Sequence, residues 1–409
     1  MKTTTQLQLT KTLIVLLSCA TIFPSSLFAL GIRTTDQDAF ASGRANAFTA
    51  TADNAAAVYY NPAGIMQLDG QNFIVGASGS IQSSHFENGT TSIDSKTRFR
   101  AAPQVYYTFK LPEQPIAFGV GIYSPFGLAV EWPDSSIFRA QATRSEINYY
   151  TLNPVIAYQV LPTLSIAAGA TINYADADFR NIPFGISGDS FRFHGDDTAF
   201  GFNAGILWHP LEKHSFGVTY RHSTDMNFEG QADTSLVPPA SFIPTSKSFP
   251  ATANFAFPSS VTAGYSFRPT PDWNLEVDID WTDWSSQKGF TVVKADGNQT
   301  LLSSWRSSWM YEFGGTRFFK NGWSVSGGYS FSQNSVPDSS FSAFVPDTDC
   351  HTLSAGVGKT YKKMSWNAGY QVGISPTRTI SGLTGNNAGA NGNYDSLSHT
   401  FALNFGYHF

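Results

Sequence analysis

Three acidic side chains at alternating positions are the clearest candidates for chemistry in this chain of 409 residues. Glu276, Asp278 and Asp280 alternate with three large apolar residues. Successive side chains of a β-strand point to opposite faces, so a strand would place the three carboxylates in one polar row. Three interpretations are open: the row anchors another segment through Arg44, it binds a cation, or it is simply solvated. A catalytic carboxylate pair is a fourth, which the spacing alone favours least.

The other polar residues form no catalytic or cofactor motif. Gly358-Lys359-Thr360 resembles the end of a phosphate-binding loop, but Leu353 stands where that loop requires its first glycine. Cys350 is the only cysteine besides Cys19, which excludes the paired ligands of a structural zinc site. No set of nucleophile, base and orienting group can be assembled. We therefore expect no metal, no cofactor and no enzymatic activity.

The composition is typical of a membrane β-barrel. Charged residues make up 13% of the chain, about half the usual share of soluble domains, whereas aromatic residues make up 15%. The mean hydropathy is only −0.15. After residue 30 no apolar run approaches the roughly 18 residues of a transmembrane helix. A net charge of −5 also argues against a nucleic-acid partner.

The N-terminus has the order of a secretory signal. Lys2 and Lys11 precede an apolar core at 12–23, and Phe28-Ala29 offers a cleavage point. We assign residues 1–29 to a signal peptide. The mature protein would then be exported.

The last eleven residues give the clearest strand pattern. Large apolar residues alternate there with small or polar ones, and the apolar row is Phe401, Leu403, Phe405, Tyr407 and Phe409. Similar rows recur upstream and predict about fourteen strands, with an uncertainty of two. A terminal aromatic such as Phe409 resembles the C-terminal strand that the outer-membrane assembly machinery recognises.

The connections between these rows alternate in length. Short turns are expected near 111–115, 161–163, 210–214, 268–272, 319–322 and 361–364. Long polar loops are expected near 83–96, 125–144, 175–196, 222–255, 285–303, 332–349 and 373–398. Such alternation indicates an outer-membrane barrel with tight periplasmic turns and long external loops. The predicted fold is an all-β transmembrane antiparallel barrel over 71–409, with both ends on the periplasmic side.

A barrel of this size has a bore that must be filled if it is not to leak. The stretch at 30–70 precedes the first strand, is rich in alanine and is long enough to fold inside as a plug. Within it, Asn61-Pro62-Ala63 can form a rigid turn. The proline fixes its own φ angle, and a short Asn side chain can bond to nearby backbone.

Several motifs make the pattern specific. The stretch at 30–70 contains Gly43-Arg44-Ala45-Asn46-Ala47 and, at 52–64, Ala-Asp-Asn-Ala-Ala-Ala-Val-Tyr-Tyr-Asn-Pro-Ala-Gly. These resemble the N-terminal hatch of the FadL-type transporters of long-chain fatty acids and aromatic hydrocarbons. Further matches along the chain are Ser124–Leu128, Leu152-Asn153-Pro154, Gly217–Arg221, Pro258–Val261, Trp273–Trp284 and Val345-Pro346-Asp347. The resemblance implies a fourteen-stranded barrel with a plug that moves hydrophobic compounds without ATP.

The resemblance also assigns candidate roles to residues. The plug and gate candidates are Gly43, Arg44, Asp53, Asn61, Pro62, Ala63 and Gly64. A kink that opens the third strand sideways would involve Gly119, Gly121 and Pro125, because glycine weakens a strand ladder and proline lacks a donor. Ligand-binding candidates are Phe126, Arg139, Arg144 and Trp284, the two arginines as partners for a carboxylate. The acids Glu276, Asp278 and Asp280 would anchor the plug.

The functional hypothesis is therefore passive uptake of hydrophobic small molecules across the outer membrane of a Gram-negative-type bacterium. The ligand would be caught above the plug and leave sideways into the lipid, through a monomeric barrel. The alternative is a polar-solute porin, or a structural or adhesive barrel whose long loops do the work, such as the Gly/Asn-rich stretch at 381–393.

Overall fold

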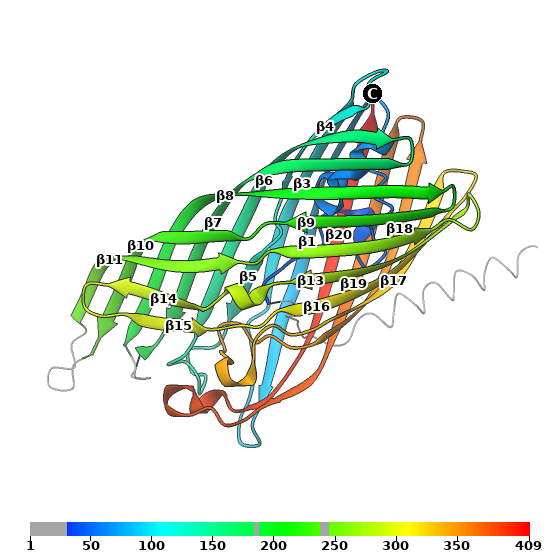
Figure 1. Cartoon of the computed structure of the whole chain (residues 1–409). Coiled ribbons are helices and arrows are strands. Elements are labelled where there is room, and N and C mark those ends of the chain that lie inside the picture. Colours follow the sequence, from blue (N-terminus) through cyan, green and yellow to red (C-terminus); the bar gives the residue numbers. More distant parts are fainter. Residues whose placement is uncertain (1–30, 184–187, 238–244) are drawn as a thin grey trace, which may run out of the picture.

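A computed structural model describes residues 31–183, 188–237 and 245–409, which form one antiparallel β-barrel with short helices inside it (Figure 1). The predicted signal peptide at 1–29 lies outside the described residues. In the part of the chain that the structure describes, no helix has the length and apolarity to cross a membrane.

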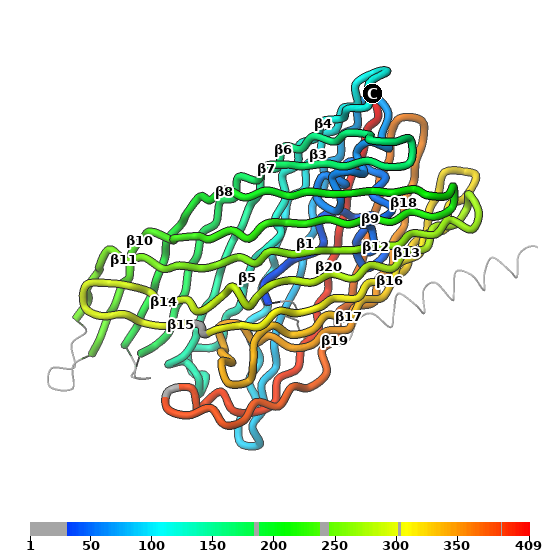
Figure 2. The backbone as a smooth tube through the Cα atoms, in the orientation of Figure 1, coloured from blue at the N-terminus to red at the C-terminus, as the bar shows by residue number. Residues whose placement is uncertain are grey.

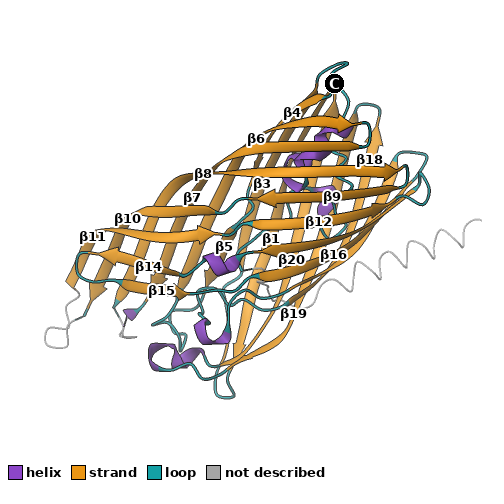
Figure 3. Ribbon diagram, viewed as in Figure 1, coloured by secondary structure: helices purple, strands orange, loops and turns teal. Residues whose placement is uncertain are grey.

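The helices are short, and the strands account for most of the chain (Figure 3). The helical elements are α2 (Ala39–Ser42), α3 (Ala57–Tyr60), η1 (Pro62–Gln67), η3 (Trp284–Ser286), η4 (Asp338–Ser340) and η5 (Gly385–Ala390). The strand segments are β1 (Gln71–Glu87), β2 (Ser92–Asp94), β3 (Arg98–Lys110), β4 (Ile116–Tyr123), β5 (Gly127–Glu131), β6 (Arg144–Leu161), β7 (Leu164–Asn181), β8 (Ser190–Leu211), β9 (His214–Arg221), β10 (Thr224–Leu236), β11 (Thr245–Phe257), β12 (Ser260–Phe267), β13 (Trp273–Thr282), β14 (Gly289–Lys294), β15 (Gln299–Ser303), β16 (Ser308–Phe318), β17 (Trp323–Ser332), β18 (Cys350–Tyr361), β19 (Met364–Ile380) and β20 (Gly392–His408).

The segments combine into a closed barrel of fourteen strands, which confirms the predicted fold. Five of these strands consist of two successive segments each: β4/β5, β9/β10, β11/β12, β13/β14 and β15/β16. The short β2 leads into β3. Each strand pairs with the next along the chain, and β20 pairs with β1 to close the sheet. Closure is required because hydrocarbon satisfies no backbone hydrogen bond.

The two faces of the wall differ as predicted. On β20 the apolar row of Phe401, Leu403, Phe405, Tyr407 and Phe409 is 40–56% exposed, whereas Ala402 and Asn404 on the inner face are at most 4% exposed. The outer face is therefore suited to lipid and the inner face to a polar bore.

The long external loops predicted at 175–196 and 222–255 are wrong in extent. Most of their described residues continue β7, β8, β10 and β11 outward from the membrane (Figures 1 and 2). On β7 the two faces exchange character beyond Tyr174: Ala177 and Phe179 are buried inside, while Asp176 and Asp178 lie on the outer row. The alternation of buried and more exposed residues continues along the strand, but the outer row here faces water instead of lipid. The charged residues that suggest a loop belong to this water-facing row.

The N-terminal segment, residues 31–68, lies within the barrel, where Figure 2 shows it as the blue trace. Helix α2 packs on β18, β19 and β20, and η1 packs on β4, β6, β7 and β8. The segment therefore contacts the wall on several sides of the bore. Its side chains are almost all buried.

Candidate functional site

The acidic row on β13 binds the backbone of the N-terminal segment. Asp278 Oδ2 accepts hydrogen bonds from the N–H groups of Phe48 (3.0 Å) and Thr49 (2.9 Å). Glu276 Oε1 accepts from the N–H groups of Ala50 (2.6 Å) and Thr51 (3.2 Å). Both acids are at most 3% exposed. Of the interpretations that the sequence leaves open, the geometry fits an anchor.

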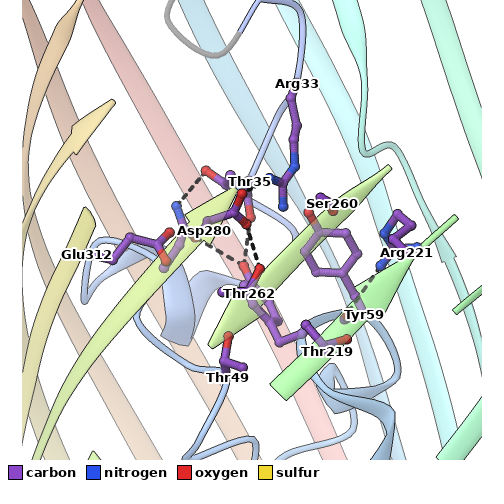
Figure 4. Close-up of a pocket in the computed structure, with 12 residues that line it drawn as sticks. Arg33, Thr35, Thr49, Tyr59, Thr219, Arg221, Ser260, Thr262, Asp280 and Glu312 are labelled. Atoms are coloured by element: carbon purple, nitrogen blue, oxygen red, sulfur yellow. Dashed lines mark hydrogen bonds and ion pairs between the residues drawn. The ribbon is translucent and has the colours of Figure 1, made fainter. Parts of the chain in front are cut away.

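Two arginines of the N-terminal segment complete this contact. Arg44 Nη2 lies 3.3 Å from Glu276 Oε2, with both side chains fully buried. Arg33 forms an ion pair with Asp280, also largely buried (Figure 4). Removing one partner of a buried ion pair typically costs about 3–5 kcal/mol, because the other charge is left uncompensated. Sequence reasoning missed Arg33, although it is the only other arginine at 30–70.

Two acids of the N-terminal segment itself make further contacts. Asp38 stabilises a helix of the segment, and Asp53 bonds to a turn of the barrel on the periplasmic side. Asp38 caps α2 by accepting from the N–H groups of Phe40 and Ala41, both at 3.1 Å. Burial raises the pKa of Asp38, and these N–H donors oppose the rise. Asp53, a predicted gate residue, accepts from Arg268 Nη2 at 2.6 Å in the turn between β12 and β13.

The Asn61-Pro62-Ala63 element is a turn that bonds to both the segment and the wall. The side-chain amide of Asn61 donates to the carbonyl groups of Thr49 (2.9 Å) and Ile206 (3.0 Å), and its oxygen accepts from the N–H of Ala63 (3.2 Å). Pro62 occupies the first position of η1, where a missing N–H costs nothing. The element therefore joins the segment to β8.

Two glycines of the N-terminal segment allow close approach of backbone, one to the wall and one within the segment. A methyl group on Gly43 would lie 2.7 Å from Cα of Gly356 on β18, and one on Gly64 would lie 2.3 Å from the carbonyl oxygen of Ala52. In both cases the obstacle is backbone, which cannot move aside easily.

We expect Gly64→Ala to loosen the N-terminal segment by about 1–3 kcal/mol, as overpacking of a tight interior does. The measurement is trypsin cleavage after Arg44 in the folded barrel, which should accelerate. Gly327→Ala is the matched control, because its nearest neighbouring atom is an acceptable 3.7 Å away. Equal cleavage rates in the two variants would contradict the expectation.

The third strand is interrupted between β4 and β5. Tyr123 pairs with Thr151 of β6 and Gly127 pairs with Asn148, so three residues, 124–126, face two residues of the partner. The extra residue is a β-bulge, and it shifts the inward-facing row by one position. Pro125 stands at this point, as the predicted kink requires.

Gly119 and Gly121 do not take part in the interruption, contrary to the prediction. Both lie within an intact ladder, in which they pair with Thr108 and Tyr106 of β3. Their bare inner faces instead make room for Val58, which would be 2.8 Å from a methyl group on Gly119. They serve the packing of the N-terminal segment.

The N-terminal segment covers the interruption from inside. The N–H of Thr34 donates to the carbonyl of Pro125 (2.8 Å), and the N–H of Gly127 donates to the carbonyl of Ile32 (2.8 Å). Gln37 Nε2 donates to the carbonyl of Ser124 (2.9 Å). Backbone groups freed by the bulge thus find partners in the segment rather than in the wall.

Beside the bulge, one ladder of the wall lacks backbone pairing over part of its length. The register of β3 with β4 runs only from Val105 to Lys110, and in the described sheet β5 is registered with β6 alone. The residues Arg98–Gln104 are paired on their β1 side. We call the unpaired stretch between Arg98–Gln104 of β3 and the facing part of the third strand the lateral seam. Its outer end is closed by a backbone hydrogen bond from the N–H of Lys96 to the carbonyl of Glu131 (2.7 Å) and by the ion pairs of Glu131 with Lys96 (2.8 Å) and Arg98 (2.9 Å).

Above the N-terminal segment the interior is filled with aromatic side chains. This outer aromatic cluster comprises Phe126, Tyr149, Phe179, Phe193, Phe228, Phe255, Phe257, Trp284, Phe290, Trp305 and Phe344. The predicted ligand residues Phe126 and Trp284 meet here, with ring centroids 6.0 Å apart. Phe126 also belongs to the bulge, so the cluster reaches the lateral seam.

Of the two predicted carboxylate partners, Arg144 points away from the cluster. Arg144 is on the outer row of β6 and is paired with Glu146, whereas Ile147 and Tyr149 on the inner row face the cluster. Arg139 lies in the connection between β5 and β6, where its carbonyl accepts from the N–H of Ile182 (2.9 Å). The carboxylate role predicted for Arg144 does not fit this outward orientation.

The bore beside the N-terminal segment is polar. One cavity is lined by Arg33, Thr35, Asn46, Thr49, Tyr59, Tyr60, Thr219, Arg221, Ser260, Thr262, Asp280 and Glu312 (Figure 4). A second, of about 140 Å³, borders the lateral seam and is rimmed largely by hydroxyl and amide groups. An apolar molecule would gain nothing by entering either cavity from the aromatic cluster.

Comparisons with known proteins agree with this geometry. Residues 20–409 match the model of the family described as outer membrane protein transport protein (OMPP1/FadL/TodX). The long-chain fatty acid transport protein of Escherichia coli O6:H1 is 25% identical over 415 residues, which cover 88% of this chain and 92% of that protein.

Solved structures share the fold. A FadL homologue of Pseudomonas aeruginosa superposes with a TM-score of 0.81 at 18% identity, covering 92% of this chain and 99% of that one. The toluene transporter TbuX of Ralstonia pickettii gives 0.70 at 17% identity, covering 91% and 98%.

Proposed function

Because the chain belongs to the OMPP1/FadL/TodX family of outer-membrane transport proteins, we propose that it admits long-chain fatty acids or aromatic hydrocarbons by passive lateral diffusion. The ligand enters the outer aromatic cluster from outside. It then leaves through the lateral seam into the lipid. The observation that carries the proposal is the position of Phe126, which belongs both to the cluster and to the interruption of the third strand.

In this proposal residues 30–70 are a plug and 71–409 the barrel. Support comes from the buried contacts of Glu276 and Asp278 with the segment and from the bridge between Arg33 and Phe126. The plug closes the polar bore to water. A shift of Ile32–Gln37 away from the bulge frees the seam, so that gating and exit involve the same hydrogen bonds.

The same proposal extends to biogenesis. Phe409 ends an outward apolar row and is 56% exposed, which suits recognition by the outer-membrane assembly machinery. A barrel whose bore is filled by its own chain needs no second copy, so we propose a monomer.

The function is tested by equilibrium binding of labelled oleate and toluene to the purified protein, together with single-channel conductance in planar bilayers. We expect binding of a hydrophobic ligand by a barrel that conducts few ions. A large, steady conductance with no binding of either ligand would identify a polar-solute porin and contradict the proposal.

A further inference from the structure

Arg100 lies across the middle of the lateral seam. Arg100 extends from β3, and its Nη2 donates to the carbonyl of Phe126 at 2.7 Å and to Ser124 Oγ at 3.4 Å. These contacts join the two sides of the wall where backbone pairing is absent. The side chain also lines the cavity of about 140 Å³ inside the seam. It is therefore accessible from the bore.

The sequence makes room for this side chain at Gly127. A methyl group there would lie 1.3 Å from Nη2 of Arg100 and 1.6 Å from its Cζ. The guanidinium thus occupies the space that any other residue at 127 would take. Because φ at Gly127 is not in the left-handed region, the close approach, rather than the backbone conformation, accounts for the glycine.

The partners of Arg100 are neutral. Arg33, Arg44 and Arg98 each have a carboxylate within salt-bridge distance, whereas the hydrogen bonds described for Arg100 go to a carbonyl and a hydroxyl. Glu146 contributes to the electrostatic field at Arg100 but is itself paired with Arg98 and Arg144. A carboxylate is a much stronger partner for a guanidinium than a carbonyl, since it can accept two parallel charge-assisted bonds.

We infer that Arg100 is a carboxylate-binding residue of the lateral seam, and that it selects monoanionic ligands with a long apolar chain. The chain lies among the rings of the outer aromatic cluster next to Phe126, and the carboxylate replaces the Phe126 carbonyl on the guanidinium. That exchange removes the link that Arg100 makes across the seam as the ligand arrives. The inference rests on the proposed function and specifies its substrate class as fatty acids rather than neutral hydrocarbons.

The test compares two ligands with the same chain, oleate and oleyl alcohol, in equilibrium binding to the purified protein at a mildly alkaline pH. Arg100→Gln should weaken oleate binding about 10- to 100-fold, the range of one or two charge-assisted hydrogen bonds, and leave oleyl alcohol within about twofold. Gly127→Ala keeps the arginine but displaces its guanidinium, and it should shift the preference in the same direction. Heat-modifiable migration in gels verifies that each barrel is folded.

Arg306→Gln is the matched control, because Arg306 is exposed and bonds to Asn334 far from the seam. It should bind both ligands like the wild type. Wild-type oleate affinity in Arg100→Gln, or an equal loss for both ligands, would overturn the inference while leaving the proposed function standing. If the wild type binds neither ligand nor toluene, the proposed function itself fails.

Discussion

Deletion of Pro125 is expected to reduce uptake of hydrophobic molecules to background while the barrel remains folded. Residues 124–126 exceed their partners on β6 by one, and removing one residue makes the register continuous from Tyr123–Thr151 to Gly127–Asn148. The alternation of faces also becomes continuous. A regular third strand can pair with β3 along its whole length, which replaces the lateral seam with an ordinary ladder.

Uptake of labelled oleate by cells that express the protein measures this effect. Pro125→Ala is the control, because it keeps the extra residue and hence the bulge, and it should retain most of the uptake. Binding to the outer aromatic cluster should persist in the deletion variant, since Phe126 still faces inward. Undiminished uptake by the deletion variant would show that the seam is not the exit.

The double substitution Glu276→Ala and Asp278→Ala is expected to convert a closed barrel into an ion-conducting pore. It leaves the N–H groups at 48–51 and the guanidinium of Arg44 without their acceptors. Each buried polar group that loses its partner costs about 1–3 kcal/mol, and a stranded buried charge costs more. The variant thus loses four hydrogen bonds and one ion pair between the segment and β13, which is expected to free this part of the segment.

Planar-bilayer recordings provide the measurement. Asp225→Ala with Glu229→Ala is the control, because these two acids share one face of β10, four residues apart, and that face points outward. The control should stay closed. A closed double variant of β13, with Arg44 still protected from trypsin, would mean that other contacts hold the segment.

Much of this architecture could be predicted because lipid imposes a strict rule on sequence. Over residues 401–409 every second residue is large and apolar, as a strand with one face in lipid requires. The acidic row on β13 could be placed in the bore for the same reason. Outside the membrane the rule is lost, since the outer row of β7 becomes charged and its inner row apolar. The strands consequently extend further than the pattern indicates.

The candidate site was less predictable, because it depends on register and on contacts between distant residues. Nothing near Arg100 in the sequence indicates that it crosses to Phe126, 26 residues away. Likewise, Pro125 marks an irregularity, but only the pairing with β6 reveals a single extra residue. In the sequence, Gly119 and Gly121 suggest a weakened strand ladder. In the structure they instead make room for Val58. A short side chain can serve either purpose, and the neighbour decides which.

The route of the ligand can be mapped directly with a photoactivatable fatty acid, by identifying the residues that it labels in the folded protein. Exit through the wall predicts adducts in the outer aromatic cluster, at Phe126 and Gly127, and at Phe99, which faces the lipid beside the seam. Adducts at Thr219 and Thr262 in the polar bore, with none at Phe99, would contradict this route.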